Sequence, residues 1–253
     1  MKYLFLNVYK GAKNRFDLLI NFVNEQKPAV LCLSELNGWN DNSFQKLHEF
    51  KARTGFKNHC FAHSKKEYHL GIFSNQSIHD VFVDNTYFRT AFLKASIGED
   101  DSQEVLLLHL DSRTEELRLK EVKKAMSYVQ TANPLILGDL NSLSPADAYN
   151  SLEIVEHMER LGLHKFGNGE IRTDVINYIL DHGLLDAVRM CSKGNLHTVP
   201  TPMNEDKAHF GKLRLDYIFV TKETFSKVRN ASVIRDDLTD SLSDHYPVMI
   251  DLV

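Results

Sequence analysis

Short apolar runs alternate with amphipathic segments from the start of the chain. Residues 3–8 form an apolar run that predicts a buried strand, and the apolar positions of residues 14–25 recur at the spacing of one helical face. A second apolar run, residues 29–34, begins after a proline and stops at Glu35, as a buried strand does where its loop begins. This order predicts a strand, a helix and a second strand, with Glu35 at the carboxyl end of the second strand.

The same alternation continues through the rest of the chain. Helical spacing of apolar positions predicts four more helices, at residues 43–53, 114–129, 146–161 and 174–182. Further strands are predicted at residues 58–62, 69–74, 80–83, 90–95, 104–110, 134–137, 213–220 and 246–253. The stretch 195–211, rich in His, Pro and polar residues, is the longest predicted irregular segment. Since no repeat, low-complexity tract or linker divides the sequence, we expect residues 1–253 to form one domain.

The composition is typical of a folded globular protein. Of the 253 residues, 43% are hydrophobic and 25% are charged, which excludes a mostly disordered chain. A large sandwich or barrel can accommodate this length around one core. The formal net charge of -4 provides no overall field that would attract nucleic acid or an anionic membrane, although that sum would hide a local basic rim. Charge therefore neither supports nor excludes a nucleic-acid substrate.

The sequence predicts neither export nor membrane insertion. The first residues contain a short apolar run but no long apolar core and no small-residue cleavage site. No segment approaches the roughly 18 apolar residues of a membrane span. Cys32, Cys60 and Cys191 are widely separated, which predicts neither a disulfide framework nor a zinc knuckle. We therefore expect a soluble protein of a reducing compartment, the cytoplasm.

Four polar segments bring carboxylates, amides and imidazoles to the points where predicted strands meet their loops. They are Ser34-Glu35, Gly138-Asp139-Leu140-Asn141-Ser142, Arg214-Leu215-Asp216-Tyr217 and Ser243-Asp244-His245-Tyr246-Pro247. A single such residue is usually a solvated charge or a helix cap, but four together predict one shared cleft. Oxygen-rich ligands suit the hard cations Mg²⁺ and Mn²⁺, whereas zinc would require more His or Cys.

In this order, and together with His109, the four segments resemble the endonuclease/exonuclease/phosphatase superfamily, which includes deoxyribonuclease I and exonuclease III. The resemblance spans nearly the whole chain, from Asn7 to Pro247. Each motif alone would be a weak signal, whereas their joint occurrence is strong. The resemblance implies a four-layer α/β sandwich in which two mixed β-sheets pack face to face, helices lie outside, and strand-end loops form a cleft at one edge.

The resemblance also implies a metal site and a nucleophile site. Asn7 and Glu35 would lie at the metal, with Glu35 the leading ligand and Asp244 a second ligand from the opposite side. The bound ion would be Mg²⁺ or Mn²⁺. Asp139 would orient or deprotonate the attacking water, and Asn141 would donate a hydrogen bond to the phosphoryl oxygen as negative charge develops there.

Three more residues complete the implied set. Asp216 would accept a hydrogen bond from His245 and fix its tautomer, and His245 would then contact the scissile phosphate or assist the nucleophile. His109 matches the position at which deoxyribonuclease I-like members carry a histidine that protonates the leaving oxygen, which makes it the candidate general acid. The structural alternatives are a buried core histidine at position 109 and a strand-end hydrogen bond for Asn7.

Departures from subfamily patterns narrow the choice of substrate. The Trp-Cys-Asp-Arg sequence of inositol polyphosphate phosphatases is replaced here by the segment from Phe210 to Asp216. Abasic-site endonucleases usually carry a tyrosine-bearing motif after the central strand and a tryptophan before the Arg-x-Asp-Tyr segment, and both are missing. Secreted sphingomyelinases would bring a signal peptide and exposed apolar loops. We therefore expect a nuclease or phosphodiesterase that acts on DNA or RNA.

Other functions stay open on the sequence alone. One is a phosphatase or phosphodiesterase for a small or lipid phosphate, and another is a non-catalytic phosphate-binding module. Three neighbouring features also have two interpretations. Arg214 would anchor the Asp216 loop or touch substrate, and Trp39 would stack at the cleft rim or anchor its loop. The late-loop residues Lys207, His209 and Lys212 would provide local positive charge or simply be solvated.

Overall fold

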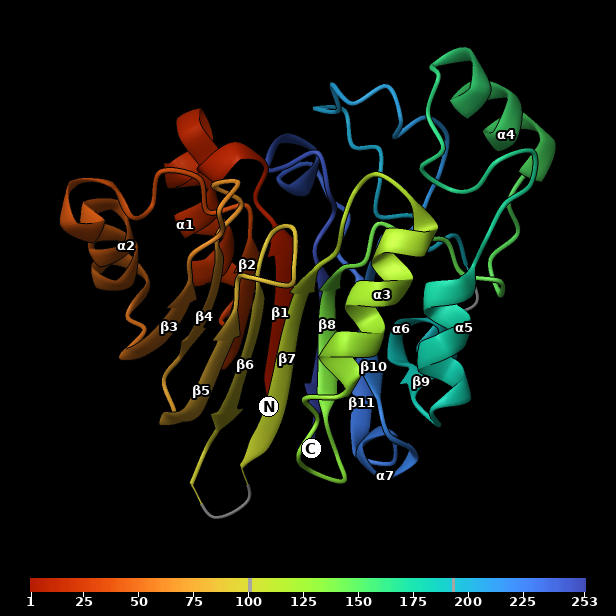
Figure 1. Cartoon of the computed structure of the whole chain (residues 1–253). Helices are drawn as coiled ribbons and strands as arrows, with labels where there is room; N and C mark the ends of the chain where they lie inside the picture. The colour runs from red at the N-terminus through yellow and green to blue at the C-terminus, as the bar shows by residue number, and fades with distance from the viewer. Residues whose placement is uncertain (100–101, 193) are drawn as a thin grey trace.

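Two six-stranded sheets pack face to face in the computed structural model, which describes residues 1–99, 102–192 and 194–253 (Figure 1). The first sheet, in the order β11-β12-β1-β2-β4-β3, contains β1 (Lys2–Asn7), β2 (Val30–Ser34), β3 (Asn58–Ala62), β4 (Leu70–Ser74), β11 (Val228–Val233) and β12 (Val248–Leu252). The second, in the order β5-β6-β7-β8-β10-β9, contains β5 (Ile78–Asp84), β6 (Phe92–Ile97), β7 (Gln103–His109), β8 (Leu135–Asp139), β9 (Leu185–Asp186) and β10 (Asp216–Val220). Both sheets are mixed, as predicted.

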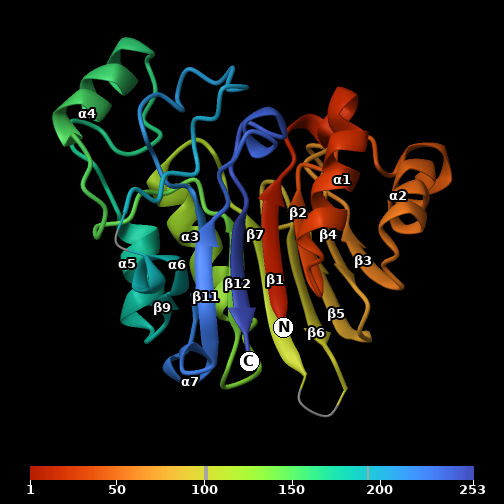
Figure 2. The same ribbon diagram turned by 180° about the vertical axis from the view of Figure 1, so that it is seen from behind.

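Helices cover the outer face of each sheet. Those on the first sheet are α1 (Phe16–Gln26) and α2 (Asp41–Thr54), and those on the second are α3 (Glu115–Met126) and α5 (Asp174–Asp181) (Figures 1 and 2). The connections contain α4 (Ser151–Arg160), α6 (Ala187–Cys191), α7 (Lys222–Phe225) and the 3-10 helices η1 (Lys10–Arg15) and η2 (Thr239–Ser241). The predicted four-layer α/β sandwich is therefore confirmed. Within the described ranges, no helix has the length and apolar character needed to span a membrane.

Strand β1 shows why the apolar runs of the sequence are continuous. Tyr3 and Phe5 belong to the cluster between the two sheets, whereas Leu4 and Leu6 belong to the cluster under α1 and α2. Because both faces of the strand are buried, no polar residue alternates with the apolar ones. The polar residue Asn7 appears only where the strand ends.

The pairing of the strands brings their polar ends to one edge of the sandwich, at the top of Figure 1. The parallel pair β1 and β2 ends together, with Asn7 the last residue of β1. In the second sheet His109 is in register with Asp139 in the parallel pair β7 and β8, and Asp139 is in register with Asp216 in the antiparallel pair β8 and β10. Since β12 runs antiparallel to β1, the segment 243–245 before β12 lies near the same edge.

The structure departs from the predicted elements mainly in the second half of the chain. The predicted helix 146–161 begins only at Ser151, because the side chain of Asn150 accepts a hydrogen bond from the Glu153 backbone and caps the helix there. The predicted strand 213–220 is regular only from Asp216 onward. The short elements β9, β11, α6 and α7 were not predicted, and β11, with exposed residues in its middle, has no continuous apolar run.

Candidate active site

A cavity of about 380 Å³, the cleft, opens at the edge where the central strands end. The predicted site residues that line it are Glu35, His109, Asp139, Asn141, Asp244 and His245. The remaining two, Asn7 and Asp216, lie behind the cleft, and each is hydrogen-bonded to a residue that lines it. The structure thus brings together residues from both sheets that are more than two hundred positions apart in sequence.

Asn7 connects the carboxylates of the two sheets. Its side-chain Nδ2 donates to Glu35 Oε1 at 3.1 Å and to Asp139 Oδ2 at 3.2 Å. Its Oδ1 accepts a hydrogen bond from the Tyr9 backbone N–H at 3.0 Å, and Glu35 Oε2 accepts one from the Lys10 backbone N–H at 3.0 Å. Asn7 therefore sets the positions of two carboxylates, while its own oxygen faces a backbone amide.

The residue before Asp139, Gly138, has no room for a side chain. It has a φ of +148°, and a Cβ atom at this position would lie 1.9 Å from the Leu108 carbonyl oxygen. The neighbouring strand β7 can approach β8 this closely only at a glycine. Three residues after Gly138, Asn141 adopts a left-handed φ of 51°, and its backbone N–H donates to Asp139 Oδ1 at 2.9 Å. This turn fixes one oxygen of Asp139 and leaves the other facing the cleft.

That second oxygen, Asp139 Oδ2, is the point on which the site converges. Besides Asn7, it lies 3.6 Å from His109 Nε2 and 3.8 Å from His245 Nε2. Both imidazoles are buried, so these charges and dipoles act on one another with little solvent screening. Asn141 completes this wall, because its Nδ2 donates to the Leu110 carbonyl at 3.1 Å and the amide group is thereby held in place.

Asp216 and His245 form the oriented pair that the sequence predicts. His245 Nδ1 lies 2.8 Å from Asp216 Oδ2, which leaves Nε2 turned toward Asp139. The backbone N–H of Asp216 donates to Thr198 Oγ1 at 3.2 Å, and the hydroxyl of Ser243 donates to the Asn7 carbonyl at 2.6 Å. The pair is therefore tied to both sheets.

The buried charges shift one another's pKa values in opposite directions. Burial alone would lower the pKa of His245, but the carboxylates of Asp216 and Asp139 outweigh it and raise this pKa to about 10. Burial likewise opposes ionisation of Asp139, yet His245 and His109 outweigh it and lower the pKa of Asp139 below its ordinary value. At neutral pH the site therefore holds an imidazolium beside a carboxylate.

The carboxylates on the other side of the cleft fit a divalent cation. Burial, together with the nearby carboxylates of Glu35 and Asp139, raises the pKa of Asp244 to about 6. Like charges at close range produce such a shift, and a bound cation would remove their repulsion. The oxygen donors of Glu35 and Asp244 match the ligands that Mg²⁺ and Mn²⁺ prefer.

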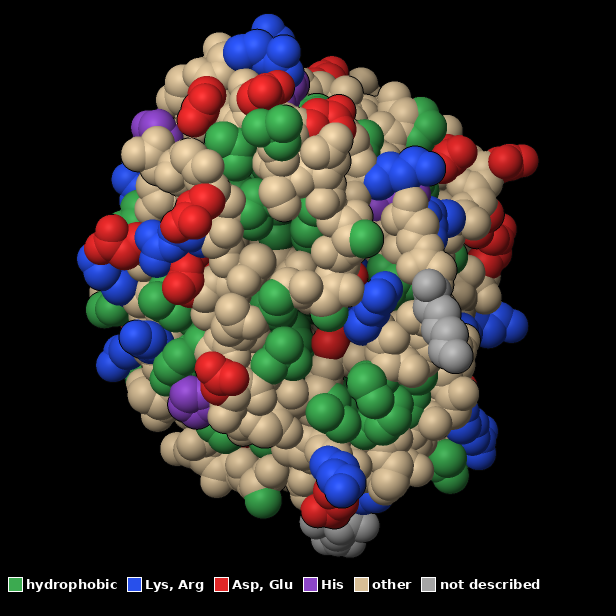
Figure 3. Space-filling model, turned by 90° about the vertical axis from the view of Figure 1, so that its right-hand side faces the viewer, with side chains coloured by type: hydrophobic (Ala, Val, Ile, Leu, Met, Phe, Trp, Pro, Cys, Tyr) green, Lys and Arg blue, Asp and Glu red, His purple; other side chains and the backbone are tan. Residues whose placement is uncertain are grey.

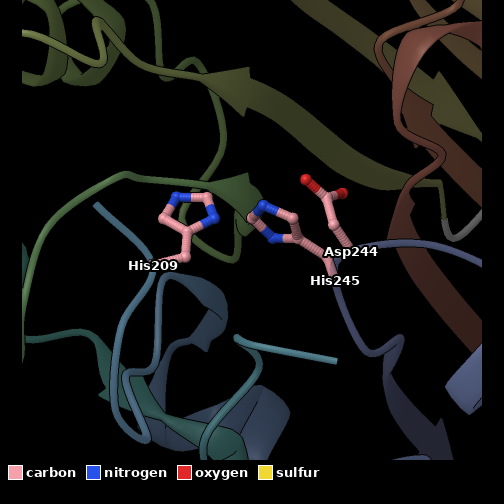
Figure 4. Close-up of side chains that lie close together, drawn as sticks. All are labelled: His209, Asp244 and His245. Atoms are coloured by element: carbon pink, nitrogen blue, oxygen red, sulfur yellow. The ribbon is translucent and has the colours of Figure 1, made fainter. Parts of the chain in front are cut away.

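A second donor set, His209, Asp244 and His245, also lies close together, with one ligand atom from each residue within 4.8 Å of the others (Figure 4). His209 Nε2, however, lies 2.9 Å from the ammonium group of Lys165. The other ring nitrogen, Nδ1, has no hydrogen-bond partner among the described residues and faces His245, but a metal ion there would lie against the protonated His245 imidazole, whose pKa is raised to about 10. The oxygen donors of Glu35 and Asp244 avoid this conflict and are the candidate ligands for a cation.

The sequence profile of the Endonuclease/Exonuclease/phosphatase family matches residues 4–245, nearly the whole chain. The chain belongs to this family. The resemblance of its motifs is therefore confirmed, and the family supports phosphoester hydrolysis as the chemistry of the cleft. A comparison with curated proteins found no match.

Solved structures of the family share the fold. An AP endonuclease from Archaeoglobus fulgidus superimposes with a TM-score of 0.74 at 19% identity, covering 100% of this chain and 99% of that chain. The 3'-5' exonuclease NExo from Neisseria meningitidis gives a TM-score of 0.74 at 20% identity, with the same coverage. A structure of NExo from Neisseria described as a 3' phosphatase bound to a product DNA hairpin gives a TM-score of 0.74 at 19% identity, again with the same coverage. At these identities the likeness shows the architecture, and the substrate has to be inferred from the cleft.

Two buried basic residues of the cleft, Lys165 and His209, were not among the predicted site residues. Lys165, in the connection between α4 and α5, and His209 are both buried, and they contact one another. The sequence offered His209 only as one of several loop residues that would add positive charge. Lys165 gave no local signal, because a lone lysine after a helix is ordinarily solvated.

The structure also decides between the remaining alternatives. Arg214 is buried and bound by Asp147 and Asp186, so it anchors the Asp216 loop. Trp39 is fully buried and donates through Nε1 to the Gly11 carbonyl at 3.0 Å, so it anchors its loop and does not stack at the rim. Lys207 and Lys212 are exposed loop residues.

The surface charge on one face of the molecule does not indicate a long basic track that would bind nucleic acid. Figure 3 views the molecule from the side of α5 and α6, and on this face Lys and Arg side chains are interspersed with Asp and Glu. Such a mixed surface agrees with the small net charge of -4. Among the described residues drawn on this face, Lys and Arg side chains form no continuous basic track.

Proposed function

We propose that the chain is an Mg²⁺- or Mn²⁺-dependent hydrolase of nucleic-acid phosphoester bonds that works by in-line attack of water. The observation that carries this proposal is the convergence of Asn7, His109 and His245 on one oxygen of Asp139, beside the carboxylates of Glu35 and Asp244. The similar Neisseria structures, a 3'-5' exonuclease and a 3' phosphatase bound to a product DNA hairpin, support a nucleic-acid substrate.

Glu35 and Asp244 would hold the ion, which when bound would supply positive charge to offset that of the phosphate. Asn7 keeps Glu35 in position by donating to Oε1. The acidic pair alone would repel a phosphoester. A phosphate can therefore approach this side of the cleft only when a cation occupies it.

Asp139 would orient the attacking water and accept its proton. Because the pKa of Asp139 is lowered, it is a weak base, and its main contribution would be to hold the water for attack. His245, protonated and oriented by Asp216, would donate a charge-assisted hydrogen bond to a phosphoryl oxygen. The side-chain amide of Asn141, fixed by the Leu110 carbonyl, would donate to the same group as charge develops.

His109 would protonate the leaving oxygen. Its Nε2 faces the cleft beside Asp139, while its Nδ1, among the atoms of the described chain, has no hydrogen-bond partner. This imidazole is therefore held by packing, including the edge of Tyr68, rather than by an orienting carboxylate like that of His245. His245 is oriented by a carboxylate, which suits it for holding a positive charge. His109 is held by packing, which suits it for exchanging a proton.

The test is hydrolysis of a labelled single-stranded and a duplex oligodeoxynucleotide, and of the matching RNA, with Mg²⁺, with Mn²⁺ and with EDTA. We expect cleavage or dephosphorylation of DNA that depends on the metal ion. Inositol phosphates and sphingomyelin, assayed under the same conditions, test hydrolysis of small or lipid phosphates. If only these were hydrolysed, the nucleic-acid assignment would be wrong although the phosphoesterase chemistry would stand.

A further inference from the structure

Lys165 lines the cleft and is almost entirely buried, with 4% of its surface exposed. Its Nζ makes one hydrogen bond, to His209 Nε2 at 2.9 Å. In the part of the chain that the structure describes, no carboxylate forms an ion pair with this ammonium group, and Asp139, Asp206 and Asp244 act on its charge only from farther away. A buried ammonium with unused N–H donors is costly, so an anion that enters the cleft would supply the missing partner.

The position of Lys165 is built into the fold. The guanidinium of Arg118, on α3, donates to the backbone carbonyl of Lys165 and is itself bound by Glu115 Oε2 at 2.8 Å. Arg118 and the following residue, Phe166, are both fully buried. The lysine therefore stands on a rigid support, and its ammonium group keeps one place in the cleft.

His209 accepts a hydrogen bond from this ammonium group without cancelling its positive charge. Burial, with a further contribution from Lys165, lowers the pKa of His209 well below its ordinary value, so the imidazole is a neutral acceptor. The ring lies 5.3 Å from the ring of His245, measured between centroids (Figure 4). Lys165, His209 and His245 therefore line the cleft close together, with the Asp244 carboxylate beside the two imidazoles.

We propose that Lys165, held by His209, is a subsite for an unesterified oxygen of the substrate phosphate and favours a terminal phosphate over an internal diester. This inference rests on the proposed function and narrows it to a class of substrate. A terminal phosphate carries close to two negative charges and three free oxygens, whereas an internal diester carries one charge and two free oxygens. The third oxygen of the terminal group is the partner that the ammonium lacks.

Steric room supports the same choice. Lys165 and His209 are 4% and 5% exposed, and the backbone behind Lys165 is occupied by Arg118. An esterified oxygen in this corner would drive its substituent into packed protein, while a free oxygen needs only the width of a hydrogen bond. An internal diester would therefore leave Lys165 without a partner.

The experiment compares one oligonucleotide in three forms, with a 3'-phosphate, with a 5'-phosphate and with hydroxyls at both ends. Lys165→Met removes the charge at similar length, Lys165→Arg keeps it, and Lys120→Met is the matched control, because Lys120 is an exposed lysine of α3 paired with Glu116. Losing a charge-assisted hydrogen bond should reduce kcat/KM on a phosphorylated end by about tenfold to a hundredfold. Diester cleavage should change by less than about threefold, and Lys165→Arg should restore much of the loss.

Binding gives a second readout that needs no turnover. Inorganic phosphate should raise the Tm of the wild-type protein in Mg²⁺ and of Lys120→Met, and should raise it much less for Lys165→Met. Dimethyl phosphate, with only two free oxygens, should shift all three alike. The Tm of each variant without ligand shows whether it is folded, and removing a buried unpaired charge is not expected to lower it.

Three outcomes would overturn the subsite. They are an equal loss on phosphorylated ends and diesters, an unchanged rate on phosphorylated ends in Lys165→Met, and an unchanged phosphate-induced shift of Tm. The proposed function fails in a different way. In that case the wild-type protein would hydrolyse none of the three oligonucleotides with Mg²⁺ or Mn²⁺, whatever stands at position 165.

Discussion

Arg214 and Asp216, two residues apart on one segment, enter two buried charged clusters with opposite properties. Arg214 Nε lies 2.7 Å from Asp147 Oδ2, and Nη1 lies 2.6 Å from Asp186 Oδ2. Asp216 Oδ2 lies 2.8 Å from His245 Nδ1, and the other nitrogen of that imidazole, Nε2, lies 3.8 Å from Asp139 Oδ2 in the cleft. We call the first set, Arg214 with Asp147 and Asp186, the anchor cluster. We call the second set the site cluster, which consists of Asp216, His245 and Asp139 with the cleft carboxylates Glu35 and Asp244.

The difference between them is how the charges are matched. In the anchor cluster a cation lies between two carboxylates, and Asp147 has a second cation, Arg189, at 3.7 Å. In the site cluster several carboxylates lie near one another, and burial, with Glu35 and Asp139 adding to it, raises the pKa of Asp244 to about 6. Burial also raises the pKa of Asp186 in the anchor cluster, so a raised pKa does not by itself identify a functional site, and the distinguishing feature of the cleft is a group of carboxylates that share one cavity.

Breaking the anchor cluster should cost the most stability. Arg214→Met leaves Asp147 and Asp186 buried without their central cation, and removal of one partner from such a pair costs about 3–5 kcal/mol. Urea unfolding should show this loss, while the folded fraction keeps kcat within about tenfold. A stable Arg214→Met variant with hundredfold lower kcat would mean that this cluster belongs to the chemistry.

Breaking the site cluster should have the reverse effect. Asp139→Asn and His245→Ala should each lower kcat by at least about a hundredfold, the scale of a lost acid–base or electrostatic group. Asp139→Asn relieves repulsion among the cleft carboxylates, so its free energy of unfolding should fall less than that of Arg214→Met, whereas His245→Ala leaves Asp216 buried without its cation. Near-normal turnover in either variant would remove that residue from the mechanism.

Glu121 tests whether a raised pKa alone marks a site. It is buried on α3 and accepts hydrogen bonds from the backbone N–H groups of Arg89 and Asp111, and burial raises its pKa to about 7. The folded protein therefore retains a proton that the unfolded chain releases, so the free energy of unfolding should fall as pH rises from the ordinary carboxyl range to about 7, by at most about 3 kcal/mol.

Glu121→Gln cannot ionise at this position. The difference in free energy of unfolding between Glu121→Gln and the wild-type protein should therefore move in favour of the variant between pH 5 and pH 8, as measured by urea unfolding. Turnover at pH 7 should stay within about tenfold, because Glu121 touches only the backbone of the cleft loops. A parallel pH dependence of the two proteins would disprove the assigned shift.

His109 can be separated from His245 by the leaving group. His109→Gln should lower the rate on DNA by about tenfold or more, since the leaving alkoxide needs a proton. Bis-p-nitrophenyl phosphate has a leaving group that departs without one, so its rate should change much less. An equal loss on both substrates would assign His109 a role in holding the phosphate or Asp139 rather than in protonation.

The smallest expected effect is at the acidic side of the cleft. Glu35→Gln should raise the Mg²⁺ or Mn²⁺ concentration for half-maximal activity by about tenfold or more while most of kcat is recovered at saturating metal. Glu49→Gln, on the exposed surface of α2, is the control. An unchanged metal titration would take Glu35 out of the ligand set.

The sequence predicted the parts of this molecule that depend on local patterns. Continuous apolar runs identified the buried strands, and the polar residues that end them, such as Glu35 and Asp139, could be expected at one edge. Periodicity alone does not distinguish this sandwich from another layered α/β fold, and the architecture followed from the joint motifs. The short β11 and α6 escaped prediction because they are ordered by packing against neighbours rather than by their own pattern.

The charged residues of the cleft also divide into those that belong to a sequence motif and those that only tertiary packing brings to the site. Asp216 and His245 belong to motifs, so their pairing could be predicted, although not the convergence of His109 and Asn7 on one oxygen. Lys165 could not be predicted, because its burial depends on Arg118 and on His209, which lies 44 positions away. Contacts of that kind depend on tertiary packing, and no window of sequence contains them.

The most direct test of the account is hydrolysis of bis-p-nitrophenyl phosphate by protein stripped with EDTA and then supplied with Mg²⁺ or Mn²⁺, for the wild-type chain and for Asp139→Asn. The account predicts no hydrolysis in EDTA, recovery of the wild-type rate when metal is restored, and a rate at least about a hundredfold lower for Asp139→Asn at every metal concentration. Hydrolysis that survives EDTA would contradict the metal mechanism. Failure to hydrolyse this or any other phosphoester with metal present would instead indicate a phosphate-binding module.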